Sequence, residues 1–181
     1  MAVQQLTIMT LSFYRRNLPH WQPEKCTIFL TWRLHGSLPK GFTEHLLKWN
    51  TEPGKQFLNA DGKLDAASIG PIWLSDPEIA ARTENAIQRG AELEHYILRS
   101  YVIMPNHVHI LLDPLVPLHK LTAGIKGVSA REANVRLGRT GKPFWQDESF
   151  DHWIRDAGQF ARIRGKFSSF TSGTRASEYL T

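Results

Sequence analysis

The sequence of 181 residues has almost no cysteine and no long apolar segment. Its single cysteine, Cys26, can form neither an internal disulfide nor a zinc site built from several cysteines. No apolar run approaches the roughly 20 residues that a membrane-spanning helix needs. The N-terminal residues also lack the charge order of a secretory signal, because their arginines follow the short apolar stretch. These absences predict a soluble, cytoplasmic protein without a membrane partner.

Repeats and low-complexity tracts are also missing from the sequence. Its hydrophobic content of 41% suits one compact domain with a core of its own. We expect that domain to span residues 1–165, with an N-terminal arm over about residues 1–24. Residues 166–181 are rich in Ser, Thr and Gly and are expected to form a divergent, disordered tail.

Positive charge is concentrated in the last third of the chain. The net charge is +5, and residues 120–175 contain 11 Lys and Arg against 5 Asp and Glu. A local basic excess of this kind is typical of proteins that bind phosphate backbones. A solvated basic helix face would produce the same excess, so charge alone leaves both interpretations open.

The hydrophobic pattern predicts strands and helices in alternation. Strands are expected over residues 26–35, 93–104, 106–113 and 148–156. Helices are expected over residues 42–49, 76–90 and 118–137, and from Asp156 onwards, where Gln159 stands at the capping-box position. This order is that of an α+β ferredoxin-like sandwich, in which an antiparallel sheet has helices on one face.

Two histidines, His107 and His109, lie one residue apart in the apolar run of residues 101–113. On a strand they project from the same face, about 7 Å apart along the strand, while Val108 points to the other face. Two partly buried histidines bonded to the backbone are the alternative interpretation, but the apolar surroundings and the basic helix that follows favour a metal site. A cation held by two imidazoles keeps positions open for phosphate oxygens and would polarise a scissile phosphodiester.

The segment "MPNHVHILL" resembles the His-hydrophobic-His motif of the HUH endonucleases, specifically of the REP-associated tyrosine transposases. The similarity extends to the opening strand, the first long helix, the basic helix and the last strand. This resemblance implies a metal-dependent enzyme that acts on single-stranded DNA, often beside a short hairpin. It further implies that His107 and His109 bind Mg²⁺ or Mn²⁺. A tyrosine on the last helix would then attack the phosphodiester and form a phosphotyrosine link.

The sequence departs from this family at the last helix. The family pattern continues there with Tyr-Ile-x-x-Asn-Pro, in which the tyrosine is the nucleophile and the asparagine helps to hold the metal. Lys166 stands at the tyrosine position and Phe170 at the asparagine position, so neither group is expected to be present. Tyr179 is the one tyrosine that follows the metal motif, and it is the candidate substitute. A truncated or frame-shifted copy would explain this pattern, and whether the chain is an enzyme stays open.

The remaining candidate site residues are predicted to contact DNA. Phosphate contacts are expected from the basic residues on and just after the helix over residues 118–137, namely Lys120, Lys126, Arg131, Arg136 and Arg139. Trp145 is a candidate for stacking on a splayed base, with packing against the sheet as the alternative.

Two functions are therefore considered for the chain, which is expected to be a monomer or a homodimer. The first is a transposase that cleaves and rejoins single-stranded DNA. The second is a non-catalytic protein that binds single-stranded or hairpin DNA.

Overall fold

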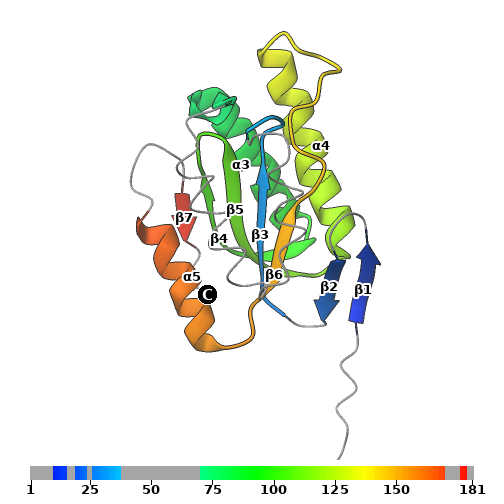
Figure 1. The fold of residues 1–181 in the computed structure, drawn as a ribbon, viewed down its shortest axis with the longest axis vertical. Coiled ribbons are helices and arrows are strands. Elements are labelled where there is room, and N and C mark those ends of the chain that lie inside the picture. Colours follow the sequence, from blue (N-terminus) through cyan, green and yellow to red (C-terminus); the bar gives the residue numbers. More distant parts are fainter. Residues whose placement is uncertain (1–9, 16–18, 24–25, 38–69, 170–175, 179–181) are drawn as a thin grey trace, which may run out of the picture.

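The structure, a computed structural model, describes residues 10–15, 19–23, 26–37, 70–169 and 176–178. Its centre is a five-stranded sheet with the order β6-β3-β5-β4-β7, in which every neighbouring pair is antiparallel (Figure 1). The strands are β3 (Ile28–Arg33), β4 (Tyr96–Ile103), β5 (His107–Pro114), β6 (Phe150–Trp153) and β7 (Ala176–Glu178). A separate hairpin pairs β1 (Thr10–Arg15) with β2 (Pro19–Pro23), within the segment that was expected to be an N-terminal arm.

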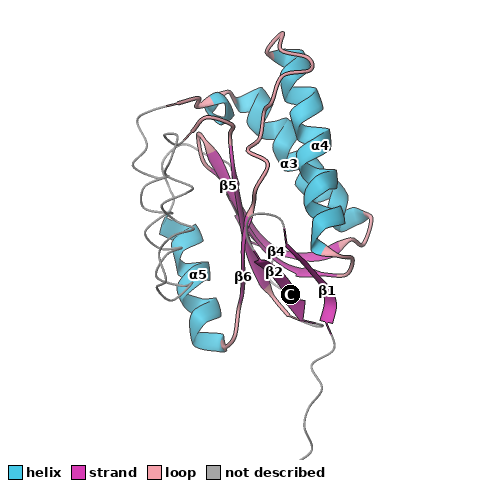
Figure 2. Ribbon diagram, turned by 45° about the vertical axis from the view of Figure 1, so that its right-hand side comes forward, coloured by secondary structure: helices cyan, strands magenta, loops and turns pink. Residues whose placement is uncertain are grey.

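Helices cover both faces of the central sheet. They are the 3-10 helix η1 (Trp73–Ser75) and the α-helices α3 (Pro77–Glu92), α4 (Leu118–Arg136) and α5 (Ala157–Ser169). Helices α3 and α4 pack side by side on one face, and α5 lies on the other (Figure 2). None of the helices in the described ranges is both long enough and apolar enough to cross a membrane.

The predicted α+β sandwich is confirmed. Among the described residues from β3 to β6, the strands and α-helices follow one another as β-α-β-β-α-β, and the first and third of these strands lie side by side in the middle of the sheet. The expectation that the helices lie on one face holds for α3 and α4 but not for α5. Helix α5 covers the other face because its buried Phe167 packs there with Phe29 and Leu111. The helix predicted over residues 42–49 lies outside the described residues.

Alternation along the strands gives each face of the sheet its own core. Ile28, Leu30 and Trp32 of β3 belong to the large cluster that α3 and α4 complete. Phe29 and Leu111 belong to the smaller cluster beneath α5. Because side chains alternate with period two, the odd-numbered residues of β5 face α5, and both histidines are among them.

The starts of two helices follow the capping rules that the sequence predicts. At α3, the Asp76 carboxylate accepts a hydrogen bond of 2.9 Å from the backbone N–H of Glu78. At α5, the N–H of Gln159 donates to Asp156 Oδ1 at 2.7 Å, and the Gln159 side-chain oxygen accepts from the N–H of Arg155 at 2.9 Å. This reciprocal arrangement fixes where α5 begins.

The end of the chain differs from the expected tail. Helix α5 runs across the expected boundary at residue 165 and continues to Ser169, and Ala176–Glu178 pair with β4 as β7. A disordered tail over residues 166–181 is therefore not what these two segments form. The physical reason is that backbone groups at the outer edge of β4 can pair with an added strand whatever side chains that strand carries.

Candidate functional site

His107 and His109 lie next to each other on the face of β5 that α5 covers. Val108, between them, belongs to the core cluster on the opposite face, as strand alternation predicts. The Nε2 atoms of the two histidines are 3.0 Å apart, and both side chains are buried. The sequence therefore places two imidazole nitrogens at one point inside the fold.

The second nitrogen of each ring is held by a neighbouring side chain. His107 Nδ1 lies 2.6 Å from Asn106 Oδ1, and His109 Nδ1 lies 2.7 Å from the hydroxyl of Thr31, the residue opposite it on β3. An amide oxygen only accepts hydrogen bonds, so His107 carries its hydrogen on Nδ1 and has a lone pair on Nε2. The Thr31 hydroxyl can donate or accept, so His109 can carry its hydrogen on either nitrogen.

These partners allow the histidine pair two arrangements. In the first, His109 Nε2–H donates to His107 Nε2 while the Thr31 hydroxyl donates to His109 Nδ1. In the second, His109 Nδ1–H donates to Thr31, and both Nε2 lone pairs face the same space. The second arrangement is the one that a metal ion requires, and side chains that hold the far ring nitrogen are typical of metal-binding histidines.

The spacing of the two nitrogens fits a six-coordinate ion. Two neighbouring ligands of an octahedral ion at about 2.1 Å are about 3.0 Å apart, which matches the observed 3.0 Å. Tetrahedral zinc would hold two nitrogens about 3.3 Å apart. Within the described ranges, no group of three or more His, Cys, Asp or Glu could hold a metal. An octahedral ion held by two histidines alone would keep four positions for water or phosphate oxygens.

Aromatic rings cover the histidine pair. Phe29 stacks on His109 with ring centroids 5.3 Å apart, and Phe167 of α5 meets the same histidine edge-on at 6.5 Å. Lys166, which stands at the tyrosine position of the family motif, precedes Phe167 in α5. The helix that carries the motif position therefore lies directly over the pair. Phe170, at the asparagine position, lies outside the described residues.

Strand β7 directly precedes Tyr179, the candidate substitute nucleophile, in the sequence. Ala176 pairs with Val102, which in turn pairs with His109, whereas Glu178 pairs with Ser100, which pairs with Leu111. Along its length β7 therefore runs from the level of His109 towards the far end of β5. Tyr179, the candidate that sequence reasoning named, lies outside the described residues.

Arg33 is a charged neighbour of the histidine pair that sequence reasoning missed. It ends β3 directly opposite His107, and directly opposite residues of an antiparallel pair project from the same face. One guanidinium nitrogen lies 3.4 Å from the hydroxyl of Ser37. Burial lowers the pKa of Arg33 from its ordinary value, but an arginine side chain keeps its charge in proteins. A partly desolvated cation thus stands beside the two imidazoles.

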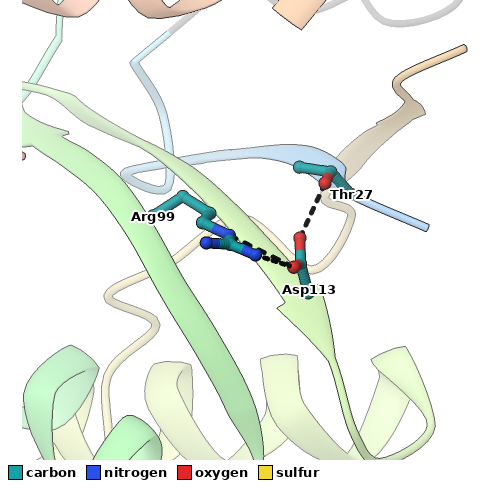
Figure 3. A network of polar contacts seen from close by, with 3 residues as sticks. All are labelled: Thr27, Arg99 and Asp113. Atoms are coloured by element: carbon teal, nitrogen blue, oxygen red, sulfur yellow. Dashed lines mark hydrogen bonds and ion pairs between the residues drawn. The ribbon is translucent and has the colours of Figure 1, made fainter. Parts of the chain in front are cut away.

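A second charged group lies at the other end of β5. Asp113 accepts a hydrogen bond of 2.7 Å from the Thr27 hydroxyl and bonds of 3.1 and 2.7 Å from Nε and Nη2 of Arg99 (Figure 3). This network ties β4 and β5 to the residue that precedes β3. Its arginine is matched by a carboxylate, so its role is to hold strands in register.

His152 also faces the α5 side of the sheet, opposite Phe29. Its Nε2 lies 2.5 Å from the side-chain nitrogen of Gln159, whose oxygen already accepts from the N–H of Arg155. The amide must donate here, so His152 Nε2 accepts and the ring is uncharged. Burial, followed by the charge of Arg155, lowers the pKa of His152 below 6.5. His152 therefore anchors the start of α5 to β6.

Two of the predicted DNA contacts, Lys120 and Arg131, are exposed on α4. They stand eleven residues apart, which returns to nearly the same side of a helix. Because α4 covers the opposite face of the sheet, this side of the molecule is separate from the histidine pair. Phosphate contact by these two residues stays a prediction.

Arg136 and Arg139 have partners within the fold. Arg136 forms an ion pair of 3.1 Å with Glu78 of α3. The Arg139 guanidinium lies 3.9 Å from the ring centroid of Trp73. Both remain part of the basic surface, but DNA contact by either one would compete with these interactions.

The structure contradicts base stacking by Trp145. Its side chain is 6% exposed, it packs edge-on against Trp32, and its indole N–H donates to the Ser129 hydroxyl at 2.9 Å. Lys126 has a similar internal role, because its ammonium donates to the carbonyls of Gln146 and Asp147 at 2.7 Å. Both side chains attach the segment before β6 to α4. Helical periodicity alone could not show that this segment folds back over α4.

Part of the chain matches a family model. Residues 73–156 match the model described as "Transposase IS200 like". This segment belongs to the IS200-like transposase family. It contains β4, β5 with both histidines, α4 and β6. The transposase family indicated by the sequence resemblance is therefore confirmed. Strand β3, which contributes Thr31 and Arg33, lies outside the matched residues of this transposase segment.

Two solved structures are similar to the chain. The structure of a REP-associated tyrosine transposase bound to a REP hairpin has 15% identity and a TM-score of 0.45, over 84% of this chain and 67% of that one. A crystal structure assigned to a transposase of Deinococcus radiodurans R1 has 15% identity and a TM-score of 0.39, over 79% of this chain and 88% of that one. A comparison with curated proteins finds no match.

Proposed function

We propose that the chain is a cytoplasmic DNA-binding protein of the transposase class that acts on single-stranded or hairpin-forming DNA through a divalent cation on His107 and His109. The observation that carries this proposal is the convergence of two buried imidazoles, with Nε2 atoms 3.0 Å apart and each Nδ1 held by a side chain. The family match over residues 73–156 supports it, because the matched segment contains both histidines.

The cation of this proposal is Mg²⁺ or Mn²⁺. Both ions accept six ligands, which fits the nitrogen spacing of the pair. Imidazole is a better ligand for Mn²⁺ than for Mg²⁺, so Mn²⁺ is expected to bind more tightly. When bound, the ion would polarise a phosphodiester by accepting one of its oxygens.

The DNA partner is supported by charge as well as by family. Residues 120–175 contain 11 Lys and Arg against 5 Asp and Glu, and Lys120 and Arg131 are exposed. Contacts of this kind hold a DNA backbone without reading its sequence. The protein would act as a monomer or a homodimer.

A non-catalytic DNA-binding protein is the second candidate function. It is favoured by Lys166, which stands in α5 where the family motif has its tyrosine, and by Phe167, which covers His109. A lysine cannot form a phosphotyrosine link, so cleavage would need a tyrosine from elsewhere in the chain, such as Tyr179.

A denaturing gel separates the two functions. The purified protein is incubated with a labelled single-stranded hairpin oligonucleotide and Mn²⁺, beside His107→Ala and a control, His119→Ala, that removes an exposed histidine of α4. A covalent adduct that needs Mn²⁺ and is lost only in His107→Ala indicates the transposase, and Tyr179→Phe then tests the nucleophile.

A native gel of the same mixtures completes the experiment. No adduct, together with a mobility shift that weakens steeply with salt, indicates the binding protein. Absence of both adduct and shift at low salt would overturn both functions. Titration of Mn²⁺ followed by electron paramagnetic resonance tests the metal site separately, with loss of binding expected for His107→Ala and His109→Ala but not for His119→Ala.

A further inference from the structure

We propose that Arg33 binds the phosphate on which the histidine pair acts, so that one phosphodiester is held between a cation on His107 and His109 and a guanidinium from β3. This inference rests on the proposed function and adds to it the group that recognises the phosphate. It assigns a role to a residue that lies outside the segment matched by the transposase family model.

The strand register carries the geometric part of this inference. Arg33 pairs with His107 and Thr31 pairs with His109, so the two residues of β3 stand opposite the two histidines on the same face. Side chains directly opposite each other on antiparallel strands have Cβ atoms about 4.5–5.5 Å apart. The guanidinium of Arg33 is therefore within reach of any anion that coordinates a metal on the pair.

Charge and shape favour a phosphate as that anion. A guanidinium is planar and presents N–H donors in a fork that matches two oxygens of a phosphate. Of its five N–H donors, one on Nη1 faces the Ser37 hydroxyl. Partial burial strengthens the attraction between this cation and an incoming anion, because water screens the charges less.

The contrast with Arg99 supports the choice of Arg33. Arg99 also lies on this sheet, but its guanidinium forms two hydrogen bonds with Asp113, a carboxylate at the far end of β5. Six residues of an extended strand separate Asp113 from His107, or about 20 Å. A phosphate near Arg99 would be repelled by Asp113 and would be too far from the pair to share its cation.

The inference can be tested without knowing the DNA target. The probe is the dinucleotide dTpdT, which contains a single phosphodiester, added to the full chain loaded with Mn²⁺. Phosphorus NMR then measures how strongly the bound Mn²⁺ accelerates relaxation of that phosphate. The variants are Arg33→Gln, Arg33→Lys and the matched control Arg89→Gln, which removes the same charge from an exposed residue of α3 on the opposite side of the sheet.

We expect Arg33→Gln to weaken dTpdT binding at least about tenfold, the usual effect of losing a hydrogen bond to a charged group. Arg33→Lys should lie between Gln and wild type, because a lysine keeps the charge but not the fork. Arg89→Gln should match wild type. Far-UV circular dichroism and Mn²⁺ affinity should be the same for all variants, which shows that the fold and the pair are intact.

Three results would overturn the inference in distinguishable ways. If Arg33→Gln binds Mn²⁺ and the dTpdT phosphate relaxes as fast as with the wild type, Arg33 does not bind the phosphate, and the proposed function still stands. Equal losses in Arg33→Gln and Arg89→Gln would mean that only overall charge matters. Failure of the wild-type protein to bind Mn²⁺ would overturn the proposed metal site and this inference with it. If Arg33→Gln does not fold, Arg33→Lys provides the test. Phosphate relaxation equal to that of the wild type would show that the two-pronged guanidinium contact with the phosphate does not form.

Discussion

Replacing Thr31 by valine tests whether the histidine pair is built for a metal. Valine has nearly the same shape as threonine but lacks the hydroxyl that lies 2.7 Å from His109 Nδ1. Both arrangements of the pair use that hydroxyl, as a donor in one and as an acceptor in the other. Losing it leaves a buried ring nitrogen without this partner, which costs about 1–3 kcal/mol of folding free energy.

Thr31→Val should also lower the affinity of the histidine pair for a metal ion. With a metal on Nε2, His109 must carry its hydrogen on Nδ1, and only an acceptor in the position of the Thr31 oxygen satisfies it. Loss of such a partner typically lowers metal affinity roughly 10–100-fold. Titration of Mn²⁺, followed by electron paramagnetic resonance, measures the change.

A matched control lies just before the same strand. Thr27→Val also removes a hydroxyl, one that donates to Asp113 at 2.7 Å at the far end of the sheet. It should lower the free energy of unfolding by about 1 kcal/mol and leave the affinity for Mn²⁺ unchanged. If Thr31→Val binds Mn²⁺ as tightly as Thr27→Val does, the hydroxyl of Thr31 does not orient a metal ligand and the reasoning fails.

Three further predictions follow from individual contacts. Phe167→Ala removes a side chain that is 4% exposed and should lower the free energy of unfolding, measured in urea, by about 3–5 kcal/mol. A decrease of less than about 1 kcal/mol would show that α5 does not pack on the histidine pair. The pKa of His152 is lowered from 6.5 in the folded state, so the unfolded chain binds more protons and the free energy of unfolding should fall as pH drops below 6.5. Thermal melts above and below pH 6.5 should show a smaller pH dependence for His152→Gln than for the wild type. Lys126→Met should lower the free energy of unfolding without changing how DNA affinity depends on salt. Lys120→Met should leave the free energy of unfolding unchanged and reduce the slope of log affinity against log salt concentration by about 1. The reverse pattern would contradict the internal role of Lys126.

Much of the fold could be predicted because local patterns and tertiary structure agree. The segments expected to form β3, β4, β5, β6, α3 and α4 do so, with boundaries displaced by a few residues. The cap at Asp156 and Gln159 locates the start of α5 correctly. The common face of His107 and His109 follows from strand alternation alone. These features depend on residues close together in the sequence.

The features that could not be predicted depend on residues far apart in the sequence. Thr31 and Arg33 join the site only because β3 pairs with β5, and no local pattern states that register. Strand β7 gains its place from the exposed edge of β4 rather than from its own residues. Trp145 is buried because its segment folds back on α4 and bonds to Ser129. Composition alone does not reveal these contacts, so the base-stacking role predicted for Trp145 was wrong.

The central position of β3 has a consequence for how the chain folds during synthesis. Both neighbours of β3 come much later in the sequence, β5 by about 75 residues and β6 by about 115, so the contacts of the sheet are strongly non-local. At a synthesis rate of about 5–20 residues per second, β3 leaves the ribosome several seconds to tens of seconds before β6 exists. Until β5 follows, about 4–15 s at the same rate, its apolar residues Ile28, Leu30 and Trp32 have neither of the neighbouring strands of the finished sheet to pair with. The nascent chain is therefore prone to aggregate at this strand, and we expect general chaperones to matter more for its yield in cells than the stability of the finished domain does.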